Sequence, residues 1–463
     1  MSNEYILIKN PLPFMNEKYI KSKLGNKYSS AKPNIILKND LPHLIFISFD
    51  KKEISDSFLN EYNNKYFDDT IDYKLVIEKT EKTLNEFQNE VKNDLVPYNF
   101  EIPYENMWKI DYVNSPEKSG LLYINEEEKQ KIYRTLKFLI TKFGKNLFEG
   151  KSIMNISFPI FVYDKRTYLQ VFAYEYKLAP YFLSRAAVSK DKLEKLKWIT
   201  VHIVSTLHFT VIQTQPFNPL LGETFQCKIG DLIIYVESTN TSLLNFSFYA
   251  FDENKKYKIY GYQIGDIMTS PNSVTSPKIG KCYIEFNDGN KYLVKFPYVF
   301  LNGIAMGDRL FNYIDKIVIL DLKNNLCSYI EMNPDELGFF KSFFSKKQTF
   351  PDHFKGKIVD SSFLDIDEKK HTYTLKKNHE ELSKIEGEWT SGCSFDDVEY
   401  WDIEEYKPLP MNHFGFLCPS DSSLREDLKY LIDNDEEKSQ VEKEKIENQE
   451  KKDMELREKC KKK

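Results

Sequence analysis

Short apolar runs separated by polar turns characterise the first 125 residues of the chain. The runs lie at Tyr5–Ile8, Ile35–Leu37 and Leu44–Phe49. Runs of this length between polar residues predict β-strands. Around Thr80–Val91 apolar residues instead recur at i, i+3 and i+7, which predicts a helix. We therefore expect residues 1–125 to form a small α/β or α+β module, and no motif in them indicates its role.

The pattern changes between Glu126 and Phe148, where an apolar stripe runs along a basic segment. The stripe consists of Ile132, Leu136, Ile140, Phe143 and Leu147. The lysines lie largely on other faces, so residues 126–150 are predicted to form an amphipathic helix with a basic polar face. Two interpretations stay open: the helix packs on its own domain, or it works as a lid that senses a membrane.

Beyond this segment the chain combines one long uncharged stretch with a series of short strands. Trp198–Gly222 contains no Lys, Arg, Asp or Glu, but its histidines, threonines and prolines favour a buried core segment over a membrane span. Strand-like runs follow at Leu232–Val236, Phe246–Phe251, Tyr257–Tyr262, Tyr283–Phe286 and Tyr292–Phe296. Closely spaced strands predict an antiparallel meander, and closure into a barrel would remove its edges.

Charge, cysteines and motifs narrow the classes of function. The 463-residue chain has a net charge of −5, whereas nucleic-acid binding needs a basic surface, so we expect no nucleic-acid partner. The six cysteines are at least 25 residues apart and form no C-x-x-C pair, and we expect no metal or cofactor. The N-terminus lacks the pattern of a signal peptide, which predicts a cytosolic location. Without a G-x-S-x-G, P-loop, Rossmann or H-E-x-x-H motif, no enzymatic activity is expected.

One segment carries specific information. Residues 215–225 read Q-P-F-N-P-L-L-G-E-T-F and stay uncharged until Glu223. The two prolines restrict Phe217 and Asn218, which holds this pair extended with its N–H groups available. The segment resembles the K-P-F-N-P-L-L-G-E-T-[YF] sequence of the oxysterol-binding-protein-related lipid-transfer proteins. The resemblance continues from Ile156 to the C-terminus and covers about two-thirds of the chain.

The resemblance implies both a fold and a ligand. The expected fold is α+β, with a large antiparallel β-barrel that encloses an apolar lipid tunnel below an N-terminal lid helix. The expected divisions are a small module at 1–125, the lid at 126–150, the barrel at 151–434 and a charged helix at 435–463. A sterol or phospholipid would occupy the tunnel, because burial of apolar area gains roughly 25 cal/mol per Å². Transient contact with intracellular membranes would load it.

The sequence departs from the family at positions that would hold a phosphorylated head group. The family's Lys is Gln215, and its E-Q-V-S-H-H-P-P signature reads E-S-T-N-T-S-L-L from Glu237. Thr241 and Ser242 therefore stand where the family has two histidines. Hydroxyl groups donate hydrogen bonds to phosphate but bring no charge. We expect the binding of phosphatidylinositol 4-phosphate to be weakened or lost.

The C-terminal helix carries the last part of the resemblance. Residues 435–463 contain ten basic and ten acidic residues, which predicts either a solvated helix with i,i+4 ion pairs or a partly disordered tail. The family has K-x-x-[LI]-E-x-x-x-R there, and Lys443, Ile446, Glu447 and Lys451 fit that spacing, with Lys replacing Arg. Lys keeps the charge but loses the bidentate fork of Arg.

These observations favour lipid transfer over one rival function. By resemblance, the lipid-binding residues are Phe217, Asn218, Leu220, Leu221, Lys443, Glu447 and Lys451. The rival is an interaction protein in which a degenerate barrel is a scaffold and residues 1–125 recruit a protein partner. A continuous apolar tunnel would favour transport, and a tunnel plugged by bulky side chains would favour the scaffold.

Overall fold

The fold is described from a computed structural model. It describes residues 4–38, 41–82, 84–93, 99–101, 112–115, 120–125, 130, 133–134, 137–138, 141, 158–211, 215–240, 244–270, 272–303, 307–333, 352–367, 371–414 and 417–461. Of the predicted lid, residues 130, 133–134, 137–138 and 141 are helical. Leu136, Ile140, Phe143 and Leu147 lie outside the described residues.

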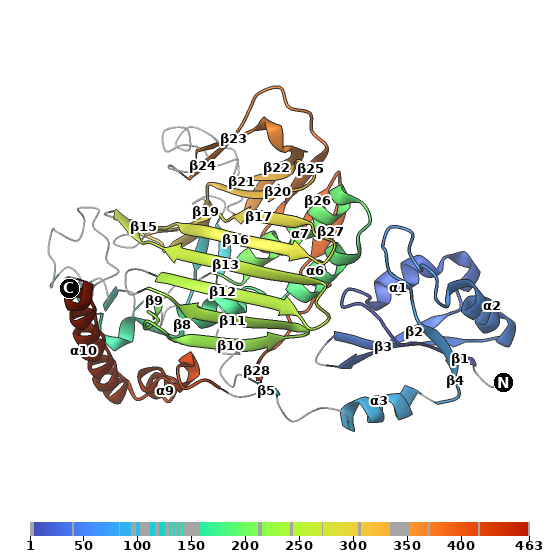
Figure 1. Cartoon of the computed structure of the whole chain (residues 1–463), viewed down its shortest axis with the longest axis horizontal. Helices are drawn as coiled ribbons and strands as arrows, with labels where there is room; N and C mark the ends of the chain where they lie inside the picture. Colours follow the sequence, from blue (N-terminus) through green and yellow to red (C-terminus); the bar gives the residue numbers. More distant parts are fainter. Residues whose placement is uncertain are drawn as a thin grey trace.

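A four-stranded antiparallel sheet forms the N-terminal module, at the right of Figure 1. Its elements are β1 (Glu4–Ile8), α1 (Glu17–Leu24), β2 (Lys32–Lys38), β3 (Leu41–Phe49), α2 (Lys52–Tyr62) and β4 (Ile77–Thr80), with the strand order β2-β3-β1-β4. One face of the sheet shares a core with α1 and α2. On the other face, Phe87 of α3 (Leu84–Asn93) packs on Leu7, Ile36 and Phe46. The predicted strands and the predicted helix of this module are confirmed.

A second, much larger antiparallel sheet forms the main body. Its fourteen described strands, in spatial order, are β27 (Val398–Asp402), β26 (Gly392–Phe395), β25 (Ser383–Glu388), β22 (His353–Asp360), β21 (Leu326–Met332), β20 (Lys316–Asp321), β17 (Lys291–Lys295), β16 (Lys278–Phe286), β13 (Tyr257–Gly265), β12 (Leu244–Asp252), β11 (Leu232–Ser238), β10 (Thr224–Ile229), β28 (Met411–Phe414) and β5 (Asn99–Glu101). Neighbours in this order pair antiparallel, as the predicted meander requires. Alternate side chains point inward, so β10 and β11 are buried at every second residue.

The described residues also form three smaller sheets. The first has the order β14 (Met268–Ser270), β15 (Ser273–Ser276), β18 (Tyr298–Asn302), β19 (Leu310–Ile314), β7 (Gly120–Tyr123) and β6 (Tyr112–Ser115). The second is the hairpin of β23 (Leu364–Asp367) and β24 (Thr372–Leu375). The third is a parallel pair of β8 (Tyr163–Thr167) and β9 (Gln215–Phe217). Because β5 and β7 pair with β28 and β19, the main body begins before the boundary expected at residue 125.

Three helices pack against the inner face of the large sheet. They are α5 (Tyr168–Tyr174), α6 (Ala179–Val188) and α7 (Lys192–His208). A capping box formed by Thr167 and Gln170 starts α5, and the Asp191 side chain caps α7. The helices share one apolar core with the inward residues of the sheet. Most of α7 is buried, so the prediction that the uncharged stretch belongs to the core is confirmed.

The C-terminal part returns along the outside of the main body. A 3-10 turn at Ser422–Leu424 leads into α9 (Glu426–Ile432) and then into α10 (Glu436–Lys461). Figure 1 shows α10 at the end of the main body that lies opposite the N-terminal module. No helix among the described residues has both the length and the apolar character needed to cross a membrane.

Arg185 of α6 joins the N-terminal module to the main body. Its guanidinium lies 4.7 Å from the ring centroid of Phe14 and 4.9 Å from that of Tyr19, both in the module. It also lies 4.6 Å from the ring of Trp198 in α7. Next to it, the Asp72 N–H donates to the carbonyl of Val188 at 2.6 Å. The module is thus held by cation–π contacts and backbone pairing.

The carboxylate of Asp68 stabilises this junction. Asp68 is buried and accepts hydrogen bonds from the Tyr19 hydroxyl at 2.9 Å and the Thr70 hydroxyl at 2.6 Å. Lys23 forms an ion pair with it at 2.8 Å. Burial by itself raises the pKa of Asp68, but these hydrogen bonds and Lys23 outweigh it and lower the pKa to about 2.

Because this folded-state pKa lies below the ordinary value of about 3.9, the ionised Asp68 stabilises the fold above about pH 4. That contribution, on the order of 2 kcal/mol, is lost as the pH falls from about 4 to about 2. We expect Asp68→Asn to unfold at lower urea than wild type at pH 6, with the difference shrinking towards pH 2. The exposed neighbour variant Asp69→Asn is the control and should follow wild type at both pH values. A pH-independent deficit in Asp68→Asn would contradict the assignment.

Candidate functional site

The segment 215–223, which contains Pro216 and Pro219 and is called the proline-framed loop here, begins as a strand. Its aromatic residue, Phe217, points inward. Residues 215–217 form β9, which pairs in parallel with β8. The side chain of Phe217 is buried and stacks on Tyr163 of β8, with centroids 4.7 Å apart and planes inclined by 22°. An offset stack of this kind adds about 0.5–1.5 kcal/mol to the burial of the two rings. The loop is therefore anchored on β8 by its central aromatic residue.

Two cations lie on this pair of rings. The Lys443 ammonium of α10 is 5.2 Å from the Tyr163 centroid, and the Arg425 guanidinium is 5.1 Å from the Phe217 centroid. Both cations are largely shielded from solvent, with side-chain exposures of 3% and 8%. Cation–π attraction is strongest for such desolvated groups. The two rings thus connect the loop with both C-terminal helices.

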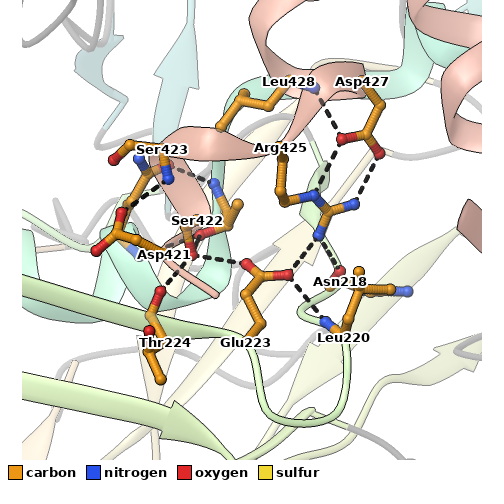
Figure 2. Close-up of polar contacts among 12 residues, drawn as sticks. Asn218, Leu220, Glu223, Thr224, Asp421, Ser422, Ser423, Arg425, Asp427 and Leu428 are labelled. Carbon is orange, nitrogen blue, oxygen red and sulfur yellow. Dashed lines mark hydrogen bonds and ion pairs between the residues drawn. The ribbon is translucent and has the colours of Figure 1, made fainter. Parts of the chain in front are cut away.

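Arg425 bridges the loop and α9, as Figure 2 shows. One terminal nitrogen donates to the Asn218 carbonyl and to Glu223, both at 2.8 Å. Its Nε and other terminal nitrogen donate to the two oxygens of Asp427 at 3.0 and 2.7 Å. Only a planar guanidinium fork can pair with one carboxylate in this bidentate way and still reach a second acid. Arg425 therefore fixes the loop relative to the start of α9.

Glu223 closes the other side of the network. Its Oε2 accepts from the Leu220 N–H at 3.0 Å, and its Oε1 accepts from the Ser422 hydroxyl at 2.6 Å. Between Leu220 and Glu223 the chain turns at Gly222, whose φ of +79° favours glycine. The Leu-Gly-Glu order read in the sequence is thus a turn that brings a carboxylate back onto its own loop.

The charges of this network compensate one another. Burial by itself lowers the pKa of Arg425, but Glu223 and Asp427 outweigh it, so the pKa lies above its ordinary value and the guanidinium stays charged. Burial raises the pKa of Tyr163, which keeps its hydroxyl neutral. Burial also raises the pKa of Glu450, one turn beyond Glu447 on α10. The site holds paired ions rather than an excess of positive charge.

The first turns of α10 dock beside this network. The Ser439 hydroxyl donates to the Asp427 carbonyl at 2.6 Å, and the Gln440 side chain accepts from the Ile160 N–H at 2.7 Å. Lys443 forms an i,i+4 ion pair with Glu447. Lys451, one turn further, is exposed on the helix surface. Of the three charged positions proposed on α10, two therefore face the site, and the third faces solvent.

The structure gathers most of the predicted loop residues here. Phe217 lies against Tyr163, Asn218 offers its carbonyl to Arg425, and Leu220 offers its N–H to Glu223. Leu221 is half-buried in the turn. The Gln215 amide donates to the Asn218 side chain at 3.3 Å, so the residue in place of the family's Lys is engaged within the loop. Thr241 and Ser242 lie outside the described residues.

Sequence reasoning missed the residues that hold the loop, namely Tyr163, Arg425 and Asp427. A signal for Arg425 was present. The chain has 65 basic residues but only six arginines, and this one stands directly before an acidic pair at the start of a helix. In so lysine-rich a chain, an arginine marks a place where the guanidinium fork is required. Asp427 carried no such signal, because nothing local distinguishes it among 70 acidic residues.

An aromatic pocket lies between α5, strands of the large sheet and the β23–β24 hairpin. Its cavity volume is about 40 Å³, and its apolar lining includes Phe172, Phe248, Cys282, Val294 and Phe296. Polar groups enter it as well. Lys278 lines the pocket and pairs with the buried Glu175 at 2.7 Å, and burial raises the pKa of that carboxyl. The mixture of apolar side chains and a few fixed polar groups resembles the lining of a small-molecule site, but about 40 Å³ has room for a few water molecules and not for a lipid.

Comparison with known proteins assigns the chain to a family. The model of the family described as "Oxysterol-binding protein" matches residues 140–463, so the chain belongs to the oxysterol-binding protein family. Oxysterol-binding protein 9 of Dictyostelium discoideum is 32% identical over 321 residues, which cover 67% of this chain and 73% of that protein. Human and mouse relatives are longer, and matches cover 21% to 35% of them.

Solved structures show the same fold. The Osh3 ORD of Saccharomyces cerevisiae, solved in complex with PI(4)P, has a TM-score of 0.54 at 19% identity, covering 70% of this chain and 84% of that one. The Osh1 ORD domain, solved in complex with cholesterol, has a TM-score of 0.55 at 17% identity, covering 73% of this chain and 90% of that one. The main body thus has the α+β, barrel-like fold of these domains, and the predicted family and fold class are confirmed.

The guanidinium of Arg425 gives a direct test of the site. Arg425→Lys keeps the charge but removes the bidentate contact with Asp427 or the contact with the loop. We expect a loss of about 2–4 kcal/mol in the free energy of unfolding, because buried acids then lack partners. Arg457→Lys, on the exposed part of α10, is the matched control and should change it by less than about 0.5 kcal/mol. Equal urea midpoints for the two variants would refute the bridging role.

Proposed function

We propose that this protein binds a lipid inside its main body and carries it between membranes through the cytosol. The observation that carries the proposal is that residues 140–463 match the oxysterol-binding protein family. Related domains have been solved with PI(4)P and with cholesterol, which supports a lipid as the ligand. A sterol or a phospholipid is the expected cargo, and no covalent step is needed.

In this proposal the amphipathic segment 126–150 is the lid. Its apolar stripe of Leu136, Ile140, Phe143 and Leu147 would close over the lipid. Opening at a bilayer would let the lipid partition into the pocket, since the membrane interface accepts the same stripe. Closure would then shield the lipid from water during diffusion. The proposal places the protein in the cytosol, peripherally associated with intracellular membranes.

We further propose that phosphoinositide binding is weak. Gln215 brings no charge, and its amide is already engaged with Asn218. Lys443 is paired with Glu447, and Arg425 is paired with two acids. Charge-assisted hydrogen bonds contribute about 1.5–3 kcal/mol each, so the loss of a Lys and two His costs on the order of 4 kcal/mol. That corresponds to a roughly thousandfold lower affinity.

The rival function, a scaffold that does not transport lipid, rests on the N-terminal module. The module is fixed to the main body through Arg185, which would suit a rigid recruitment platform for a protein partner. An extraction assay separates the two functions. The purified chain is incubated with vesicles that carry either a labelled sterol or a labelled phospholipid, and the soluble fraction is assayed for label. Saturable extraction near one lipid per chain supports transfer, and no extraction of either lipid supports the scaffold.

Restoring the missing charge tests the weak phosphoinositide binding. We expect Gln215→Lys to bind vesicles containing phosphatidylinositol 4-phosphate about tenfold more tightly than wild type, because it adds one charge-assisted hydrogen bond. Asn287→Lys adds the same charge at the exposed turn after β16 and is the control. If wild type binds these vesicles as tightly as Gln215→Lys does, the replacement of the family's Lys by Gln215 does not weaken phosphoinositide binding.

A further inference from the structure

Two hairpin turns of the large sheet contact the N-terminal module. The first turn joins β10 to β11 at Gly230, where a Cβ atom would lie 2.6 Å from the Cδ1 atom of Leu41 in β3. The second turn joins β12 to β13, and its Lys256 ammonium lies 5.3 Å from the ring centroid of Tyr73 in the module. The module therefore covers both turns with an apolar side chain and an aromatic ring.

Two carboxyl groups lie together at these turns. Asp231 follows Gly230 in the first turn, and the Glu253 N–H of the second turn donates to its carbonyl at 2.9 Å. Asp252 pairs with Leu232, the residue after Asp231, so the two aspartates are neighbours on adjacent strands. Asp252 is buried. The Oδ1 atom of Asp231 is also buried and accepts no hydrogen bond from the part of the chain that the structure describes.

The two aspartates differ in their hydrogen bonds. The Oδ1 atom of Asp252 accepts from the backbone N–H groups of Lys256 and Tyr257, the latter at 3.1 Å. Donors of this kind stabilise the ionised form of a carboxyl group. Because Oδ1 of Asp231 has no donor, a negative charge on Asp231 would be held beside Asp252 with one oxygen neither hydrated nor hydrogen-bonded. Such a charge is costly in a buried place.

Other charged groups of the turns act on Asp231 in opposite directions. The ammonium of Lys256 attracts its ionised form, whereas Asp252 and Glu253 repel it. Lys228 of β10 forms an ion pair with Glu253 at 2.7 Å and so reduces that repulsion. One ammonium is therefore shared by two neighbouring carboxyl groups, and the same ammonium makes the cation–π contact with the module.

The carboxyl group of Asp231 titrates near neutral pH. Burial, and then repulsion by Asp252, raise its pKa to about 7, although Lys256 attracts the ionised form. Tyr73 and Tyr257 stay neutral there, because burial raises the pKa of both hydroxyl groups. The geometry and the charges therefore agree that the protonated form of Asp231 suits the covered turn better than the ionised form.

We propose that Asp231 is a pH-sensitive switch that controls how firmly the N-terminal module is attached to the main body. While Asp231 is protonated, Lys256 stays on the ring of Tyr73 and Leu41 covers the first turn. Ionisation places a second carboxylate beside Asp252, and release of the module from the turns lets water reach that charge. The module is thus held firmly at acidic pH and more loosely at neutral pH. The switch does not depend on lipid binding.

Opening of the junction changes the pKa of Asp231, which fixes the direction and the pH range of the effect. In the open junction the hydrated carboxyl group has its ordinary pKa of about 3.9. In the closed junction its pKa is about 7. Between these two values opening releases a proton, so the equilibrium constant for opening rises by up to about tenfold per pH unit. Above about pH 7 Asp231 is ionised in both states, and the constant levels off.

Hydrogen–deuterium exchange of the full chain, read by mass spectrometry, tests the proposal. Peptides that contain Asp72 report opening, because its N–H donates to the Val188 carbonyl across the junction. Their exchange is measured between about pH 5 and pH 8 and corrected for the intrinsic pH dependence of amide exchange. From about pH 5 to pH 7.5 we expect opening to rise at least tenfold in wild type and less than threefold in Asp231→Asn. Peptides of β3, which pairs with β1 inside the module, should keep their protection.

Glu237→Gln is the control, because it removes an exposed carboxylate at the other end of β11 and should follow wild type. Lys256→Gln is a second variant that leaves Asp231 in place. Without the attracting ammonium, the rise in opening should level off at a higher pH than in wild type. Equal protection of the wild-type junction at both pH values overturns the proposal. So does a pH dependence that Asp231→Asn retains in full, or a levelling pH that Lys256→Gln leaves unchanged.

Discussion

The buried guanidinium of Arg425 is the interaction on which the arrangement of the site depends. It joins a loop, a helix start and two acids that lie about 200 residues apart in the chain. Without it, Glu223 and Asp427 would be neighbouring buried acids, and such uncompensated charge costs several kcal/mol. The fold of the loop, the course of α9 and the docking of α10 through Ser439 all follow from this one bridge.

In the proposed function, the same bridge weakens the binding of a phosphorylated head group. A phosphorylated head group needs free cations, but Arg425 is committed to two carboxylates and Lys443 to Glu447. The same two cations also make cation–π contacts, Lys443 with the ring of Tyr163 and Arg425 with the ring of Phe217. The lining of the aromatic pocket includes none of these groups. In the proposed function, apolar recognition would therefore be separable from head-group recognition.

Local patterns predicted the elements that depend on periodicity. Strand-like runs marked β11 and β12, and the absence of charge marked the buried α7. The resemblance of residues 215–225 supplied the fold class, which no periodicity would have given. Long-range pairing could not be predicted from the sequence, because no local pattern indicates that β5 pairs with β28 or that Arg425 contacts Asn218. The proposed site positions at Thr241 and Ser242 stay predictions.

Native mass spectrometry of the chain purified from a eukaryotic host is the most direct test of lipid carriage. The account predicts one sterol or phospholipid per chain, released by organic extraction and identified by its mass. That lipid should be retained in Arg425→Lys if the variant stays folded, because the pocket is separate from the bridge. A chain that arrives empty and takes up no lipid from vesicles would contradict the account and favour the scaffold.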